Sequence, residues 1–440
     1  MPSRIARFYQ GMDGHMRDIV RGASAAFLLR VAGAGLSLGF NIALARILGS
    51  EGMGLYFLAL SVTTIAAVLG RFGLDGTLLR FSAAGAANDD WAGVRGVYLK
   101  GIAFAFVAAS IAVLVVEVSA PWLAKLVFSE PSLTDSMRWM ALSAVPVALF
   151  TLHGQVLLGI GQVRDGIAVL SLWGPLFSLV GIFVLAPSRG VEGAIWAYDA
   201  AAVLTLGIGV WRWRKATPQL AKVKAKFRTS ELLRSSGPLF WVTVFQMVIV
   251  WIPTLLLGTW GSSADVGVFA AASRTVLLTS FILFAVNSIT SPKFSMLHKQ
   301  GDLAALERVA KDSTKLIVLV SGPILLVFWL LPEHIITVFG AQFASGATVL
   351  SILAIGQFVN MVTGPAGNLL MMCGHERLVR NNIGLCAIIC VLLNVSLIPT
   401  MGLTGAAIAG AATLAIENLL MAWAAWWKLK ILTIPMSIAR

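Results

Sequence analysis

About twelve apolar stretches, each close to or longer than 20 residues, constrain this chain more than any other feature. A helix rises about 1.5 Å per residue, so about 20 apolar residues cross the roughly 30 Å hydrocarbon core of a bilayer. Hydrophobic residues make up 58% of the chain and charged residues only 12%, far from the balance of a soluble domain. We therefore predict a multi-pass membrane protein. The predicted spans are 22–48, 53–75, 97–118, 137–159, 166–187, 191–212, 236–259, 266–291, 314–331, 346–372, 382–401 and 403–426.

The spans are predicted to be helices, which makes the fold class all-α. Inside lipid each backbone N–H and C=O group must be paired within the protein, which leaves helices or a closed barrel. The spans are rich in Gly, Ala, Leu and Ile and lack the strict alternation of barrel strands. The first span is longer than a signal-peptide core, and no small-residue cleavage pattern follows it, so we expect it to be retained.

The formal net charge of +13 is distributed unevenly over the predicted loops. If the N-terminus is cytoplasmic, 27 of the 33 Lys and Arg fall on the cytoplasmic side, four fall outside and two lie within spans. This asymmetry follows the positive-inside rule and places both termini in the cytoplasm. The four outside residues are Arg46, Lys125, Arg138 and Arg189.

The densest basic run connects the sixth and seventh spans. We expect it to lie on anionic lipid headgroups. A nucleic-acid partner is not expected, because no folded module presents these charges. The run consists of Arg212, Arg214, Lys215, Lys222, Lys224, Lys226, Arg228 and Arg234.

An internal repeat organises the chain. Residues 153–162 resemble residues 366–375 at an offset of 213, and two further segment pairs match at nearly the same offset. Each half then holds six spans, and because six is even, both halves enter the membrane from the same side. We predict parallel repeats related by an axis along the membrane normal, with a central cavity that serves alternating access. The predicted units are 1–212 (first six-helix bundle), 213–235 (basic cytoplasmic linker) and 236–440 (second six-helix bundle).

Four segments carry a resemblance to a known family. Ala45-Arg46-Ile47-Leu48-Gly49-Ser50-Glu51-Gly52-Met53-Gly54-Leu55-Tyr56 resembles the opening signature of oligosaccharide flippases of the multidrug/oligosaccharidyl-lipid/polysaccharide (MOP) exporter superfamily. Residues 265–272, 338–343 and 394–409 are similar to later motifs of that family and occur in its order. The resemblance covers nearly the whole chain. It implies a transporter, not an enzyme, that flips a polyprenyl-pyrophosphate-linked oligosaccharide to the outer leaflet for cell-surface polysaccharide biosynthesis.

The same resemblance implies a place and partners for the protein. We expect it in the bacterial cytoplasmic (inner) membrane, with a polysaccharide polymerase and glycosyltransferases of the same pathway as partners. Lipid II flippases, which the chain resembles more distantly, have two further spans, and this disfavours a role with peptidoglycan precursors. No cofactor or metal is expected, since Cys373, Cys386 and Cys390 have no ligand-type spacing to any His.

Arg30 and Arg274 stand out among the charged residues of the predicted spans because they lie far from the span ends. At about 1.5 Å per residue each lies about 12 Å from one end of its span, near the middle of the membrane. Charges there are costly, so they are functional-site hypotheses. A guanidinium fork suits phosphate oxygens, and we predict that Arg30 and Arg274 bind the pyrophosphate head group. The alternative is that each pairs with an acid of its own bundle or reaches a lipid headgroup.

Acidic and amide side chains inside the spans complete the predicted site. Asp199 and Glu417 are candidates for proton or sodium coupling, and local pairing with groups such as Asn418 is the alternative. Trp241 or Trp251 could offer a stacking face for sugar. Candidates for cavity residues that meet sugar hydroxyls are Asn41, Gln246, Asn287, Gln357 and Asn360.

Three other functions are open. A cation-coupled multidrug exporter of the same superfamily would carry a cavity acid, which Arg30 and Arg274 argue against. A membrane sugar polymerase or ligase would need a large outer loop with catalytic residues, whereas the predicted outer loops are short, and we find no catalytic motif of soluble enzymes. Composition alone does not exclude an assembly scaffold without transport activity.

Overall fold

The computed structural model describes residues 14–227 and 229–434, with side chains from residue 26 onward. Both chain termini and Arg228 of the basic run lie outside the described residues. All regular elements of the described chain are helical, which confirms the all-α prediction. The longer helices are α2 (Gly14–Arg71), α3 (Leu74–Ala87), α4 (Trp91–Trp122), α5 (Leu133–Leu142), α6 (Ala144–Gly159), α8 (Trp173–Ala216), α9 (Thr229–Trp260), α10 (Ser263–Leu277), α11 (Ser280–Gln300), α12 (Leu303–Leu330), α14 (Gly346–Thr363) and α16 (Glu376–Leu429).

Short helices connect these rods or interrupt them. They include two π-helical turns, η1 (Leu123–Val127) and η2 (Ala168–Leu172), which follow α4 and α7. The other short elements are α7 (Val163–Ile167), η3 (Pro218–Lys222), α13 (Pro332–Ile336), η4 (Thr337–Phe339), η5 (Ala341–Phe343) and α15 (Ala366–Met372).

Nine helices of the described chain are long and apolar enough to cross a membrane. Three of them contain one residue with non-helical backbone angles, Gly49 in α2, Gly190 in α8 and Gly402 in α16. All three glycines have positive φ angles, which glycine adopts without a Cβ clash, so the chain reverses there between two spans. Divided at these glycines, the nine helices give the number of spans predicted from the sequence.

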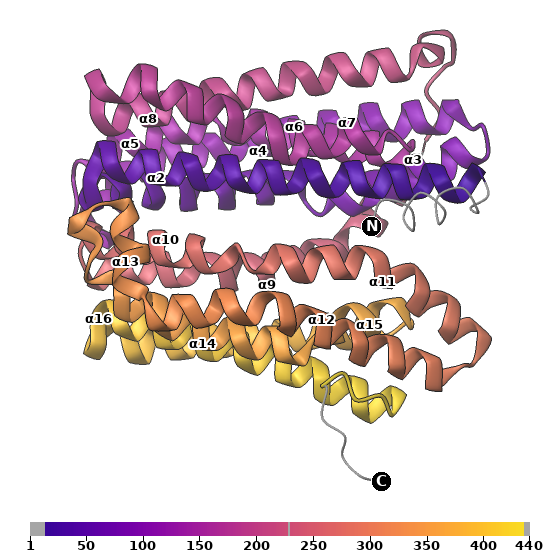
Figure 1. Cartoon of the computed structure of the whole chain (residues 1–440). Helices are drawn as coiled ribbons and strands as arrows, with labels where there is room; N and C mark the ends of the chain where they lie inside the picture. The colour runs from indigo at the N-terminus through magenta and orange to yellow at the C-terminus, as the bar shows by residue number, and fades with distance from the viewer. Residues whose placement is uncertain (1–13, 228, 435–440) are drawn as a thin grey trace.

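The first and last groups of helices occupy separate regions of the molecule. Figure 1 shows α2–α8 together in one layer and α9–α16 in another, with α2 facing α10 between them. We call the end with Gly49, Gly190 and Gly402 the glycine-break end, and the end with η3 the linker end. The proposed unit boundaries at 212 and 236 stay a prediction.

The backbones of the two halves meet closely near the glycine-break end. A Cβ atom on Gly54 of α2 would lie 1.7 Å from the carbonyl oxygen of Ser263, and one on Gly267 of α10 would lie 2.0 Å from that of Ser50. The repeat offset of 213 maps Ser50 onto Ser263 and Gly54 onto Gly267. The contact is therefore reciprocal, as an axis of pseudo-two-fold symmetry requires.

Further contacts close the same end. The Arg46 Nε donates a hydrogen bond to the Val338 carbonyl of the other half at 2.9 Å. A hydrophobic cluster of residues from both halves, from Phe40 to Ala407, surrounds this region. A second cluster belongs to the C-terminal half alone, and a third belongs to the N-terminal half and the start of α9. The shared core thus joins the halves around the reciprocal contact.

The linker between the halves is held on the N-terminal half by its backbone. Arg95 of α4 donates to the carbonyl groups of Leu220 and Val223, and the Lys100 ammonium donates to the Phe227 carbonyl at 2.7 Å. The side chains of Lys222, Lys224 and Lys226 are exposed. The binding of anionic lipids by these lysines stays a prediction, and the docked backbone leaves them free to make it.

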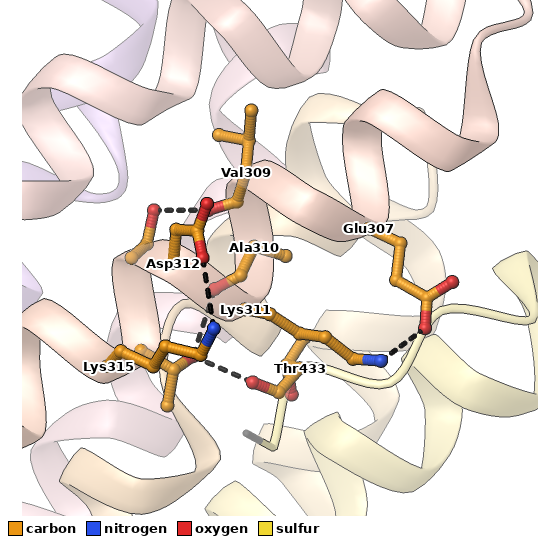
Figure 2. Close-up of polar contacts among 9 residues, drawn as sticks. Glu307, Val309, Ala310, Lys311, Asp312, Lys315 and Thr433 are labelled. Atoms are coloured by element: carbon orange, nitrogen blue, oxygen red, sulfur yellow. Dashed lines mark hydrogen bonds and ion pairs between the residues drawn. The ribbon is translucent and has the colours of Figure 1, made fainter. Parts of the chain in front are cut away.

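The segment after α16 returns to the linker end of α12. Thr314 Oγ1 of α12 donates to the Thr433 carbonyl at 2.7 Å. Figure 2 shows Thr433 near the ion pairs of Lys311 with Glu307 and of Lys315 with Asp312. Ile431 is buried in the core of the C-terminal half. This packing ties the end of the described chain to the second half.

We expect Gly54→Ala to lower the melting temperature of the purified protein. The added methyl group must push Ser263 away, and overpacking of this kind costs about 1–3 kcal/mol. Gly207→Ala is the matched control, because a Cβ on this glycine of α8 meets nothing within 4 Å. Thermal unfolding in detergent measures both variants. Equal melting temperatures for the two variants would contradict the close contact between α2 and α10.

Candidate functional site

Two adjoining cavities lie between the halves. The Arg30 compartment, with a volume of about 330 Å³, is lined by α2, η2, α8, α10 and α11. The tyrosine compartment, of about 290 Å³, is lined mainly by α2, α6 and α8. The two share four lining residues and therefore lie side by side. These are Ser37, Asn41, Pro175 and Arg274.

Irregular helix geometry opens this space. The fifth span passes through the π-helical turn η2 and then Gly174-Pro175, where the proline lacks a backbone donor. Gly33 of α2 packs so closely on η2 that its Cβ would lie 2.0 Å from the Ser171 carbonyl oxygen. Non-helical backbone is tolerated at membrane depth where it lines a cavity. Gly174 and Pro175 thus both line the site.

Arg30 lines the Arg30 compartment from α2. Its guanidinium carbon lies 4.0 Å from the ring centroid of Phe284 on α11, a cation–π distance between the halves. Its Nε is buried and has no hydrogen-bond partner among the described residues. The pairing of Arg30 with an acid of its own bundle, the alternative from the sequence, does not occur in the described chain.

Arg274 reaches from α10 into an aromatic environment. Its guanidinium carbon lies 5.3 Å from the ring centroid of Phe57 and 5.5 Å from that of Trp251. The phenol groups of Tyr56 and Tyr198 lie close enough to interact with its charge. Trp251 therefore packs near the arginine, although it is not among the lining residues of either compartment, whereas Trp241 packs on Phe240 and is largely exposed. A stacking role for either ring stays a prediction.

The two arginines face one space from opposite halves, and the lining residues of both compartments include no carboxylate. Arg274 likewise has no ion pair with an acid in the described chain. Two uncompensated guanidinium groups in a low-dielectric cavity create a strong positive potential. Such a site attracts an anion that accepts hydrogen bonds from both.

Asp199 lies behind the tyrosines rather than in the cavity lining. It is half-buried in α8, beside Ser143 and near the hydroxyls of Tyr56 and Tyr198, and its Oδ1 has no hydrogen-bond partner among the described residues. Glu417 lies in the other half, on α16, near the thiols of Cys386 and Cys390. The structure does not bring the two acids together.

Of the five predicted amide and polar cavity residues, Asn41 lines both compartments. Gln357 and Asn360 are buried within the C-terminal half, where Gln357 Nε2 donates to Ser280 Oγ at 2.6 Å and Asn360 Nδ2 donates to Gln357 Oε1. Gln246 is exposed on α9, and Asn287 is half-buried on α11 with a buried Oδ1 that has no partner in the described chain. These four are not among the lining residues of either compartment.

The sequence argument did not single out Tyr56 or Tyr198 as site residues. Tyr56 stands at the end of the segment 45–56 that carries the family resemblance, and Tyr198 directly precedes Asp199. The side of each helix on which Tyr56 and Tyr198 lie can be read from the sequence. Their proximity could be predicted only by knowing which spans pack against each other. Their rings are 6.4 Å apart in an edge-to-face arrangement.

Comparison with known families supports a transporter scaffold. Residues 19–298 match the family described as "Polysaccharide biosynthesis protein". The chain belongs to the polysaccharide biosynthesis protein family. Residues 238–400 also match the MatE family. Together with the relatives below, these matches confirm the resemblance to oligosaccharide flippases of the MOP superfamily.

The proteins that this chain is similar to include named flippases and transporters. The "Probable low-salt glycan biosynthesis flippase Agl15" of Haloferax volcanii is 25% identical over 92% of this chain and 83% of its own length. "Lipid II flippase MurJ, inward closed conformation" matches with a TM-score of 0.73, 13% identity and coverage of 92% of this chain and 87% of the other. An inward-facing MATE family transporter of the MOP superfamily matches with a TM-score of 0.72, 14% identity and coverage of 93% and 98%. The fold is thus that of MOP transporters.

We expect Ser37→Cys, in a variant whose native cysteines are replaced by alanine, to react faster with an anionic than with a cationic methanethiosulfonate reagent of similar size. Ser37 lines both compartments, so Arg30 and Arg274 concentrate anions near it. Adding Arg30→Gln lowers the ratio of the two rates by about tenfold. A ratio that does not change with Arg30→Gln would contradict a positive cavity.

Proposed function

We propose that this family member flips a polyprenyl-pyrophosphate-linked oligosaccharide from the cytoplasmic to the outer leaflet, for cell-surface polysaccharide biosynthesis. One observation carries the proposal. Arg30 and Arg274, one from each half, line one cavity without a carboxylate partner among the described residues. A pyrophosphate supplies the missing negative charge and several acceptor oxygens, while its isoprenoid tail stays in lipid.

The location of the arginines on opposite halves gives the binding event a mechanical effect. A head group that bridges Arg30 of α2 and Arg274 of α10 interacts with both halves at once. A rocking motion about the axis between the halves then changes which end of the cavity is open. Cargo binding favours the transition to the extent that it binds the transition conformation more tightly than the starting one.

The setting of this transport is part of the proposal. The protein is proposed to reside in the cytoplasmic membrane of a bacterium with both termini inside, although the Agl15-type relatives are archaeal. Glycosyltransferases build the lipid-linked cargo on the inner face, and a polymerase uses it on the outer face. Anionic lipids near the exposed linker lysines are the proposed surface partner.

Two of the three alternative functions fit the site less well. A multidrug exporter for cationic compounds needs negative charge in its cavity, and the described lining residues of both compartments carry positive charge instead. A polymerase or ligase needs a large extramembrane domain. Between α12 and α14, at the glycine-break end, the chain holds only the short elements α13, η4 and η5.

We expect Arg30→Ala and Arg274→Ala each to reduce transfer of a labelled polyprenyl-pyrophosphate oligosaccharide in proteoliposomes by about tenfold to a hundredfold. Hydrogen bonds to charged groups contribute about 1.5–3 kcal/mol each, and this loss corresponds to that range. Lysine at either position restores transfer only in part, because an ammonium group lacks the planar fork of arginine.

The matched control for these variants is Arg377→Ala. Arg377 is exposed in the first turn of α16, at the linker end and away from both compartments. Its replacement removes one positive charge and leaves transfer at the wild-type rate. Wild-type transfer by both cavity variants, with the protein inserted at normal abundance, would refute the phosphate-binding role.

Asp199 is the proposed coupling carboxylate, and Glu417 is the second candidate. Asp199 lies near Tyr56 and Tyr198, which line the tyrosine compartment, whereas Glu417 lies near the thiols of Cys386 and Cys390 on α16. We expect an imposed proton or sodium gradient to accelerate transfer, and Asp199→Asn to remove the acceleration. Glu376→Gln, an exposed acid at the start of α16, is the control. Equal transfer by the wild-type protein with and without both gradients would exclude coupling through either acid.

A further inference from the structure

The tyrosine compartment differs from the Arg30 compartment in composition and in origin. Its lining combines aromatic rings with small and polar residues, and apart from Arg274 all of it belongs to the N-terminal half. Phe40, Tyr56 and Phe57 come from α2, and Tyr198 comes from α8. A wall of rings with a single cation at its mouth suits a ligand with an apolar face attached to an anionic group.

A polar group in this wall has no partner. Tyr56 is 1% exposed, and its hydroxyl has no hydrogen-bond partner among the described residues. Buried hydroxyl groups are normally paired, because desolvation without a partner is unfavourable. The ring is fixed by Phe40 and Phe57, with centroid distances of 5.9 and 5.6 Å, so the hydroxyl is held in place rather than free to turn away.

The order of these features along the membrane normal follows from the helix rise. Tyr56 is seven residues from the break at Gly49, and Tyr198 is eight from Gly190, which places both roughly 10–12 Å from the glycine-break end. Arg30 is nineteen residues from Gly49, roughly 28 Å from that end, so it lies nearer the linker end than the mid-membrane depth predicted from the sequence. Arg274 lies between them, because it lines both compartments. Counted along the membrane normal from the linker end, the order in space is Arg30, then Arg274, then Tyr56 and Tyr198.

We propose that the tyrosine compartment binds the sugar ring attached directly to the pyrophosphate, with Tyr56 donating to or accepting from a ring hydroxyl and Tyr198 packing on a C–H face. The inference rests on the proposed function and deepens it. When the polyprenyl chain leaves the pyrophosphate on the side of Arg30, a pyrophosphate between Arg30 and Arg274 places the attached sugar beyond Arg274, at the tyrosines. The volume of about 290 Å³ is at the lower end of small-ligand sites, which suits one or two rings.

The subsite gives the protein a means to distinguish loaded from unloaded carrier lipid. A bare polyprenyl pyrophosphate satisfies Arg30 and Arg274 but leaves the Tyr56 hydroxyl unpaired. A site built to bond a hydroxyl group disfavours the ligand that lacks it. Asn41 and Ser37 line both compartments and are the polar groups nearest the junction.

The test compares the binding of bare and sugar-bearing carrier lipid to the full-length protein in detergent. The probes are a polyprenyl pyrophosphate and the same lipid carrying one glucose, galactose, N-acetylglucosamine or N-acetylgalactosamine. We expect the wild-type protein to prefer at least one sugar-bearing probe. Tyr56→Phe, which removes only the hydroxyl, lowers this preference by about fivefold to tenfold, the effect of one neutral hydrogen bond. Tyr198→Leu removes a stacking face and lowers it further.

Tyr98→Phe is the matched control, because the same atom is removed outside the cavity, where the Tyr98 hydroxyl is hydrogen-bonded to His153 Nε2 at 3.0 Å. It keeps the wild-type preference. A preference that survives in both Tyr56→Phe and Tyr198→Leu, or a wild-type protein that binds bare and sugar-bearing lipids equally, overturns the subsite and leaves the flippase proposal standing. A wild-type protein that binds none of the probes overturns both.

Discussion

The close approach of α2 and α10 is the contact on which the arrangement of the molecule depends. The missing side chains of Gly54 and Gly267 let each backbone touch the carbonyl of the serine four residues before the partner glycine. In lipid no hydrophobic force holds two apolar helices together, so close backbone packing of small residues has to do it. Arg274 lies two helical turns beyond Gly267 on the same helix, and the contact therefore also sets where this cation enters the cavity.

Irregular helix geometry borders the cavity. The π-helical turn η2, Gly174 and Pro175, and the end of α10 before α11 all lie along the compartments. Arg30 and Arg274 are half-buried there and have no ion pair with an acid in the described chain. A charge at membrane depth without such a partner is costly, and the proposed function rests on this cost.

The sequence predicted the helical spans, but it did not show which side chains of each span point toward the cavity. Span positions, the helical fold class and the repeat could be predicted because they depend on local hydropathy and on an offset of 213 residues. Arg30 and Arg274 stood out because charge within an apolar span is rare. Gln357 and Asn360 look like Asn41 in sequence, but only the packing of the spans decides that Gln357 bonds to Ser280, Asn360 bonds to Gln357 and Asn41 lines the cavity. Tyr56 and Tyr198 were missed for the same reason, since their pairing is tertiary.

The reciprocal serine–glycine contact has the form of an interface between identical subunits, although it lies within one chain. In an isologous interface residue i of one partner meets residue j of the other, and j meets i in return. Ser50 with Gly267 and Ser263 with Gly54 obey this relation. The surfaces of α2 and α10 thus match each other in the way the surfaces of two identical subunits do, without a second chain. The covalent linker adds a further tie, because Arg95 and Lys100 hold its backbone on α4.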